Sequence, residues 1–185
     1  MLLLGWLVLA VSWCVWAYPF IFLAPHHQKR PSITAIGPTR VGLFLESLAI
    51  FLAFAFRMPA DPPPEWWRIA TAAACGVAGA ILAWTAVRHL GRQFRVHAGL
   101  YEDHELVTSG PYAIVRHPIY TSLLAMLVCS LLILSGWRWA VVCLALFVAG
   151  TEIRVHTEDG LLASRFGERF FEYRERVRAY VPFVR

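Results

Sequence analysis

Residues 119–151 read IYTSLLAMLVCSLLILSGWRWAVVCLALFVAGT, and this stretch decides the fold class. Its charged residue is Arg138, which lies in the break Ser135-Gly136-Trp137-Arg138. A membrane-spanning helix needs about 20 apolar residues, and irregular backbone inside a bilayer leaves polar groups unsatisfied. We therefore predict two apolar helices in a tight hairpin. Each arm is short for a span, so we expect it to lie in thinned bilayer or to extend to the interface through Trp137 and Trp139.

Three further apolar runs precede this hairpin: Leu2 to Leu23, Val41 to Phe56 and Ile69 to Val87. The first has no basic residue before it, so we interpret it as a span and not as a cleaved signal peptide. The composition is 58% hydrophobic and 16% charged, with a mean hydropathy of +0.56, which excludes an ordinary water-soluble enzyme. We predict an all-α integral membrane protein with about five transmembrane helices, in one domain over residues 1–185.

The basic residues are distributed unevenly over the two sides of this arrangement. All of them except Arg57, Arg68 and Arg138 fall on the side of the C-terminus. Cytosolic loops carry an excess of Lys and Arg, so we expect the N-terminus outside and the C-terminus in the cytosol. The net charge of +5 then reflects orientation, not nucleic-acid binding. Because Lys29 is the single lysine of an arginine-rich chain, a bacterial inner membrane is expected.

The half after residue 87 carries the polar chemistry, while residues 1–87 carry three spans and no motif. We expect residues 88–185 to form a loop before the fourth span, the hairpin and a C-terminal amphipathic helix. The apolar side chains of that helix recur at intervals of three and four residues: Leu162, Phe166, Phe170, Tyr173, Val177 and Tyr180. This face would cap the bundle or lie on the membrane as an anchor without chemistry.

Small residues inside the spans are interpreted structurally. Gly76 and Gly79 favour close helix packing. The cysteines lie in apolar runs without metal-ligand spacing, so we predict small buried hydrophobes and no metal site: Cys14, Cys75, Cys129 and Cys143.

Residues 104–120, HELVTSGPYAIVRHPIY, gather polar and aromatic groups before the fourth span. Pro118 suits the first turn of a helix, which places His117 at its N-cap. The helix N-terminus and Arg116 would attract an anionic group such as a carboxylate. The rings of Tyr112 and Tyr120 offer faces to a cation.

Polar side chains also follow the hairpin, at Arg154, His156, Glu158 and Asp159. Arg154 and Glu158 share a helix face, and the simplest interpretation is a solvated ion pair worth a few tenths of a kcal/mol. S-Adenosylmethionine, with its carboxylate, ammonium, sulfonium and adenosine, would use all the features of both segments.

Several short motifs follow one another along this half of the chain: Gly110-Pro111-Tyr112, Arg116-His117-Pro118-Ile119-Tyr120, Glu158-Asp159, Arg165-Phe166-Gly167-Glu168, Tyr173-Arg174 and Val181-Pro182. Together, from Leu90 to Phe183, the chain resembles the isoprenylcysteine carboxyl methyltransferase family, which belongs with the phospholipid methyltransferases. It departs from the family at Asp159, where a Glu is usual, and at Ser122, where Gly is common.

The resemblance implies methyl transfer from S-adenosyl-L-methionine to a lipid-like or prenylated acceptor, with S-adenosyl-L-homocysteine as product. Carried over by motif, Arg154 and Glu158 are the expected catalytic residues, and Ser122 would border the acceptor tunnel. The expected donor-binding residues are His104, Leu106, Val107, Gly110, Tyr112, Arg116, His117, Pro118, Tyr120, Glu158 and Asp159.

Glu46 lies inside the second apolar run, about 9 Å along a helix from Arg40. Intramembrane acids are costly and face a partner or a cavity. We expect Glu46 to line the acceptor tunnel or to pair with an arginine such as Arg88 or Arg92, and the alternative is snorkelling to the interface.

The sequence is also compatible with other acceptors and with other classes of function. The acceptor could be a prenylated cysteine carboxylate, a phospholipid amine, a small thiol or a lipidic phenol. A carboxylate needs no base, whereas the other acceptors would use His156 or Glu158. A membrane reductase with a nicotinamide cofactor and a scaffold that binds anionic lipid through its basic tail are the alternatives from other classes.

Overall fold

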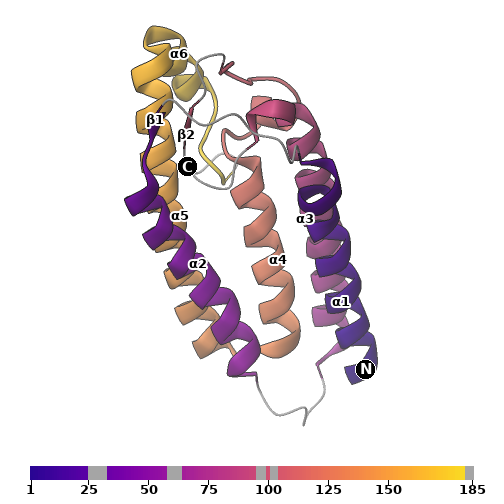
Figure 1. The fold of residues 1–185 in the computed structure, drawn as a ribbon. Coiled ribbons are helices and arrows are strands. Elements are labelled where there is room, and N and C mark those ends of the chain that lie inside the picture. Colours follow the sequence, from indigo (N-terminus) through magenta and orange to yellow (C-terminus); the bar gives the residue numbers. More distant parts are fainter. Residues whose placement is uncertain (25–32, 58–63, 95–98, 101–103, 182–185) are drawn as a thin grey trace.

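The computed structural model describes residues 1–24, 33–57, 64–94, 99–100 and 104–181. Its apolar helices run side by side (Figure 1): α1 (Leu2–Tyr18), α2 (Ile36–Ala55), α3 (Trp66–Leu90), α4 (Pro118–Leu134) and α5 (Trp137–Phe166). Four helical segments of the described chain are long and apolar enough to cross a membrane, and α4 is a shorter apolar helix. The all-α integral membrane fold is therefore confirmed.

The predicted hairpin is present between α4 and α5. Ser135 and Gly136 have extended backbone and separate the two helices, and α5 begins at Trp137. α5 then continues for 30 residues, well beyond its apolar part. One rigid helix therefore carries both lipid-facing residues and the polar residues Arg154, Glu158 and Asp159.

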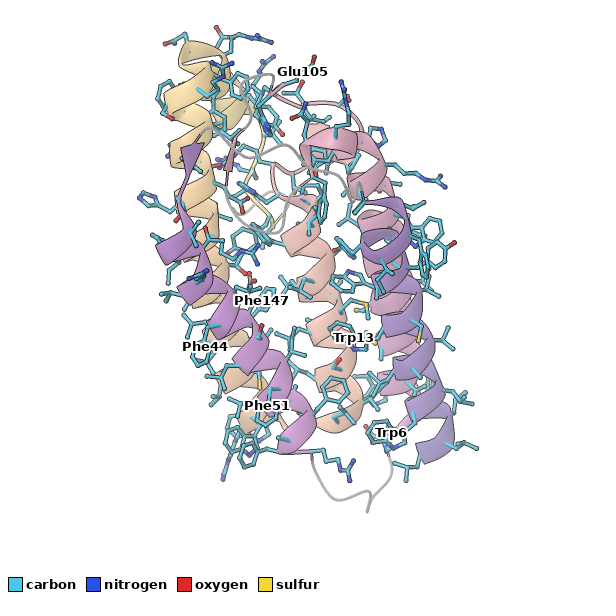
Figure 2. All side chains as sticks on the ribbon, viewed as in Figure 1. Trp6, Trp13, Phe44, Phe51, Glu105 and Phe147 are labelled. Carbon is cyan, nitrogen blue, oxygen red and sulfur yellow. The ribbon has the colours of Figure 1, made fainter. Side chains whose placement is uncertain are left out.

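α4 is the element shared by two apolar cores. The first core joins α2, α4 and α5, and the second joins α1, α3 and α4. Phe147 of α5 is fully buried in the first core, whereas Phe44 and Phe51 of α2 are 64% and 65% exposed (Figure 2). Large apolar side chains on the outer surface of the bundle are what a lipid environment accommodates.

Small residues allow α3 to approach its neighbours, as predicted. A Cβ atom on Gly76 would lie 2.2 Å from Ser12 Oγ, and one on Gly79 would lie 3.1 Å from the carbonyl oxygen of Ser122. All four cysteines are free, and Cys129 and Cys143 are buried. The prediction of burial is wrong for Cys14, which lies on the exposed face of α1.

Short elements gather at the end of the bundle opposite the N-terminus, called here the polar end (Figure 1). They include η1 (Pro19–Leu23), η2 (Gly91–Gln93), η3 (Gly110–Ala113) and α6 (Glu168–Arg176). β1 (Ile33–Thr34) and β2 (Gly99–Leu100) form one antiparallel pair.

The C-terminal amphipathic helix is present as α6, but it is shorter than the repeat predicts. Gly167, with φ of +53°, separates it from α5. Val177 has extended backbone, and Arg178 and Ala179 accept hydrogen bonds from the amides of Arg116 and His117 at 2.8 and 2.7 Å. The helical prediction is therefore wrong for Val177 and Tyr180, because this backbone pairs with the segment before α4.

Close packing at Gly76 generates a stability prediction. Gly76→Ala should lower the free energy of unfolding by about 1–3 kcal/mol, because Ser12 cannot withdraw without moving α1. Gly160→Ala in α5 is the matched control, because no atom lies within 4 Å of its Cβ position. Alanine there should stabilise the helix by up to about 1 kcal/mol. Thermal unfolding in detergent checks both signs, and an unchanged Gly76→Ala midpoint would contradict the packing argument.

Candidate functional site

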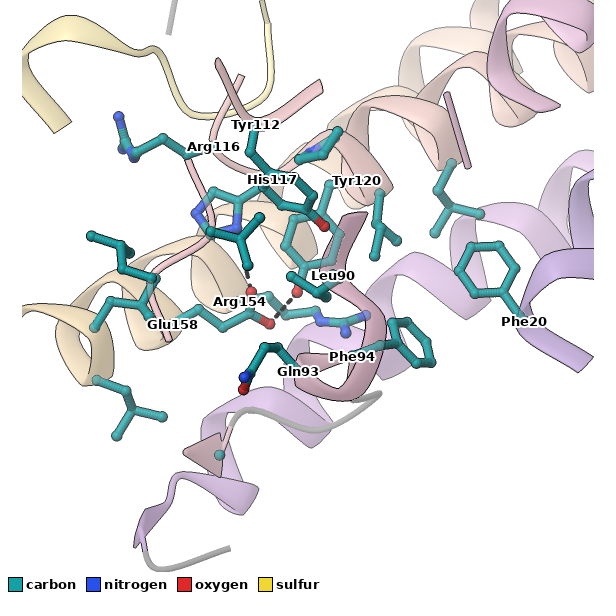
Figure 3. A pocket seen from close by; sticks show the side chains of 18 of the residues that line it. Phe20, Leu90, Gln93, Phe94, Tyr112, Arg116, His117, Tyr120, Arg154 and Glu158 are labelled. Atoms are coloured by element: carbon teal, nitrogen blue, oxygen red, sulfur yellow. Dashed lines mark hydrogen bonds and ion pairs between the residues drawn. The ribbon is translucent and has the colours of Figure 1, made fainter. Parts of the chain in front are cut away.

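A cavity of about 420 Å³ lies at the polar end and is bordered by all five apolar helices and by the loop before α4. One wall is polar, formed mainly by the loop, the start of α4 and the polar part of α5. The other wall is apolar. Figure 3 shows His117, Tyr120, Arg154 and Glu158 together, with Phe20 and Phe94 on the other side of the cavity.

His117 lies between two carboxylates on the polar wall. Its Nδ1 is 3.3 Å from Glu158 Oε2, and its Nε2 is 3.0 Å from Asp159 Oδ1. Asp159 also accepts a hydrogen bond from Arg116 Nη2 at 2.8 Å. The position follows from local sequence, because His117 is the N-cap of α4 and Pro118 occupies the first turn, as predicted.

The surroundings of His117 favour its charged form. Burial alone would lower its pKa, but the hydrogen bonds to Asp159 and Glu158 and their negative charges raise the pKa above its ordinary value. An imidazolium therefore joins the two carboxylates of α5 to the start of α4.

Tyr120 and Arg154 complete the polar wall. The Tyr120 hydroxyl donates a hydrogen bond to Glu158, and the Arg154 guanidinium carbon lies 4.7 Å from the centre of the Tyr120 ring. Arg154 Nη1 donates to Glu46 Oε2 at 2.6 Å. Arg154 and Glu158 therefore do not form the solvated ion pair considered from the sequence, because Arg154 pairs with Glu46 and Glu158 pairs with His117.

Most of the predicted site residues line this cavity: His104, Leu106, Val107, Tyr112, Arg116, His117, Pro118, Tyr120, Arg154 and Glu158. Among the described residues, four predicted ones are not part of the lining: Glu46, Gly110, Ser122 and Asp159.

Each of these four has a structural place instead. Gly110 has φ of +60°, and a Cβ atom there would lie 2.3 Å from His89 Nε2. Ser122 is buried between helices, where its hydroxyl accepts a hydrogen bond from Trp16 Nε1 at 3.0 Å. Asp159 bonds to His117 and Arg116, which themselves line the cavity.

Glu46 pairs with an arginine, as predicted, but not with either of the two arginines named as examples. It is 1% exposed, so it does not snorkel to the interface, and in the described part of the chain it bonds to Arg154 and to Thr151. Arg88 is not the partner because Glu46 faces α5, whereas Arg88 lies on α3 over the ring of Trp84.

The other histidines differ from His117 in where they lie. His156 is exposed on α5 and lies outside the cavity lining, so it is the wrong candidate for a base; Glu158 is the candidate that reaches the cavity. His89 is exposed, with Nδ1 2.8 Å from the Thr85 carbonyl oxygen. His26, His27 and His97 lie outside the described residues.

Two buried tyrosines support the loop without titrating. Tyr173 of α6 donates from its hydroxyl to the Tyr112 carbonyl oxygen at 2.5 Å. Burial raises the pKa of both phenols, and the negative charge of Glu158 raises the pKa of Tyr112 further. Both remain neutral hydrogen-bonding groups at neutral pH, so neither serves as a base.

The apolar wall is the part of the site that the motifs miss. Trp16, Ala17, Phe20 and Ile21 come from α1 and η1, and Leu43 comes from α2. Trp16 and Phe20 lie four residues apart, which is a helix-face signal, but α1 is apolar on every side. The sequence therefore offers no contrast that selects this face.

Gln93 Oε1 and Arg116 Nε belong to lining residues and are buried without a hydrogen-bond partner within the described chain. Buried polar atoms are normally paired, so these two mark places for ligand groups. The described residues contain no cluster of three or more His, Cys, Asp or Glu side chains that could hold a metal ion.

Comparison with known proteins gives one family. The sequence model of the isoprenylcysteine carboxyl methyltransferase family matches residues 72–164, from α3 to the end of the polar part of α5. Protein-S-isoprenylcysteine O-methyltransferases B and A of Arabidopsis thaliana are 34% and 32% identical over 126 residues, which are 65% of this chain and 62% of each relative. The matched region is thus less than two thirds of either relative.

A bacterial relative matches a shorter region. The cobalt-zinc-cadmium resistance protein CzcN of Cupriavidus metallidurans is 40% identical over 82 residues, which are 44% of this chain and 37% of that protein.

The raised pKa of His117 predicts a pH dependence of stability. The charged form stabilises the folded state, so its contribution is complete below the ordinary value of 6.5 and is lost as the pH rises through the higher folded-state value. The thermal midpoint in detergent should therefore fall as the pH rises above about 6.5. His117→Asn should remove this fall, whereas His156→Gln, at an exposed site, should keep it. Equal slopes in wild type and His117→Asn would refute the assignment.

Proposed function

This chain belongs to the isoprenylcysteine carboxyl methyltransferase family, and we propose that it transfers a methyl group from S-adenosylmethionine to the carboxylate of an isoprenylated cysteine in a membrane. The observation that carries the proposal is a cavity with buried, paired charges on one wall and aromatic and aliphatic side chains on the other. A polar donor and a lipid-like acceptor need these two environments side by side.

The residues present fit the methyl donor. Arg116 Nε–H is a free hydrogen-bond donor for a carboxylate, and Gln93 Oε1 is a free acceptor for an amino or hydroxyl group. His104 and Tyr112 border the same space and add polar and aromatic surface. The amino-acid and nucleoside parts of S-adenosylmethionine present groups that complement these atoms.

The chemistry needs little from the protein besides positioning. When bound, S-adenosylmethionine supplies an electrophilic methyl group, which a carboxylate can accept without a general base because it is ionised at neutral pH. The negative charge of Glu158 favours a cationic donor, and Arg154 orients the acceptor carboxylate. The apolar wall excludes water, which strengthens these interactions.

The bonding of Glu158 supports a carboxylate over other acceptors. An amine, thiol or phenol has a proton to lose, and, apart from the exposed Glu105, Glu158 is the carboxylate of the cavity lining that could take it. That carboxylate already accepts hydrogen bonds from Tyr120 and His117. It is therefore committed to holding the site together and is a poor base.

The apolar wall supports a lipid-like acceptor. Ile21 lines the cavity and is also 54% exposed on the surface of the bundle, so the wall reaches the lipid-facing side. An isoprenyl chain could lie along Phe20 and Ile21 with its cysteine carboxylate toward Arg154. Given the excess of basic residues at the polar end, the proposal places this site on the cytosolic face, with the N-terminus outside, in a bacterial inner membrane.

The decisive experiment combines donor binding with acceptor selection. Detergent-purified protein should bind S-adenosylhomocysteine in calorimetry and should transfer radiolabelled methyl from S-adenosylmethionine to N-acetyl-S-farnesylcysteine. The amide of the same compound should receive no label, because it has no carboxylate. Label in phosphatidylethanolamine, a small thiol or a lipidic phenol, with none in the farnesylcysteine, would assign a different acceptor.

Glu158→Gln tests the site residue by residue. Loss of this charge should lower methyl transfer at least about tenfold and weaken S-adenosylhomocysteine binding, because His117 and Tyr120 lose their charged partner. Glu172→Gln, at an exposed position of α6, is the matched control and should leave both unchanged. Wild type that folds and binds no S-adenosylhomocysteine in detergent or in lipid would remove the donor site from the proposal.

A further inference from the structure

Glu46 is the buried acid that the proposed mechanism leaves unused. It lies in the middle of α2 with 1% exposure, and it is not among the described residues that line the cavity. An acid inside a membrane helix is costly, and here it faces a residue that does line the cavity. Any role of Glu46 in the site must therefore act through its contact with Arg154.

We propose that Glu46 is a positioning residue that holds the Arg154 guanidinium against the Tyr120 ring and sets the cationic group that faces the acceptor. This inference rests on the proposed function for the role of the acceptor. It assigns Glu46 no contact with donor or acceptor, so any effect on turnover passes through Arg154.

The contacts define one arrangement of the guanidinium. Glu46 Oε2 accepts a hydrogen bond from Arg154 Nη1 at 2.6 Å, and Glu46 Oε1 accepts one from Thr151 Oγ1 at 3.0 Å. Both carboxylate oxygens are thus used by α5, which prevents the carboxylate from rotating. On the other side, the guanidinium carbon lies 4.7 Å from the centre of the Tyr120 ring. Arg154 is therefore held between α2 and α4.

The backbone of α2 and α5 is shaped for this contact. A Cβ atom on Gly42 would lie 2.4 Å from Arg154 Cγ, and one on Gly150 would lie 2.6 Å from the Gly42 carbonyl oxygen. Gly42 and Glu46 are four residues apart and share a helix face. The absence of side chains at both glycines lets the stem of Arg154 cross α2 and reach Glu46.

Charge explains why a neutral partner would not serve equally well. Three basic groups, Arg116, His117 and Arg154, and three acids, Glu46, Glu158 and Asp159, are joined by the ion pairs at this end of the bundle. Glu46 is the most deeply buried of the three acids, so its loss removes a negative charge from a poorly solvated place beside Arg154. Without that charge, Arg154 would hold an acceptor carboxylate more strongly but less accurately, which costs transition-state geometry.

The test uses one measurement that does not depend on activity. In protein labelled with 15N-arginine, the Nε–H resonance that disappears in Arg154→Lys reports the surroundings of that side chain. The Tyr120 ring current should displace this resonance from the other arginine signals. Glu46→Gln should move it toward them, and Thr151→Val, which keeps the ion pair, should move it less.

Kinetics supply the second measurement. Glu46→Gln should lower kcat about tenfold or more without a matching rise in KM for N-acetyl-S-farnesylcysteine, and should keep S-adenosylhomocysteine affinity within about twofold. Glu46→Asp restores the charge and should recover part of kcat. In an Arg154→Gln background, Glu46→Gln should cause no further loss, because the two act as one unit.

Ser130→Ala is the matched structural control, since it removes a buried hydrogen bond from Trp13 Nε1 in the same bundle. It should lower the thermal midpoint and leave kcat and the Arg154 resonance unchanged. An unmoved resonance in Glu46→Gln overturns the proposal. So does a parallel fall of stability, donor affinity and kcat that Ser130→Ala reproduces.

Failure of the proposed function gives a different pattern from failure of this inference. If wild type methylates no acceptor while Glu46→Gln still shifts the Arg154 resonance and Ser130→Ala does not, the acceptor assignment is wrong and the positioning of Arg154 stands. If Glu46→Gln does not fold, Glu46→Asp takes its place, and a Glu46→Asp protein with wild-type kcat and an unmoved Arg154 resonance overturns the positioning role.

Discussion

A connected set of ion pairs in a poorly solvated place is the constraint on which the polar end of this molecule depends. Buried charges are tolerated only when paired, and here each cation has an acid in reach: Arg116 with Asp159, His117 with Asp159 and Glu158, and Arg154 with Glu46. The pairs connect α2, the start of α4 and α5. Because each pair joins two elements, the positions of α2, α4 and α5 at this end are tied to one another.

The fold was largely predictable because membrane-spanning helices are recognisable from their apolar composition. Five apolar runs and the break at Ser135 and Gly136 correspond to the observed helices and hairpin. The tail was less predictable. Its side chains recur at helical spacing through Tyr180, but Gly167 interrupts the helix and the backbone after Arg176 pairs with residues 115–117. Backbone pairing across such a distance leaves no trace in side-chain periodicity.

The candidate site was predictable where residues are polar and unpredictable where they are apolar. The segment from His104 to Tyr120 and the polar turn of α5 stand out because such groups are unusual beside a span. Glu46 also stood out, but its partner lies 108 residues away, and no local pattern selects Arg154 over other arginines. The apolar wall from α1 was missed because a helix that is hydrophobic on all sides does not distinguish a cavity face from a lipid face.

The pairing of Arg116 and His117 with Arg178 and Ala179 also sets an order of assembly. All five apolar helices leave the ribosome before residues 178–180 do. Until then, the amides of Arg116 and His117 have no partner from the tail. Synthesis of every apolar helix is therefore complete before the last residues of the chain can fasten the segment that leads into α4.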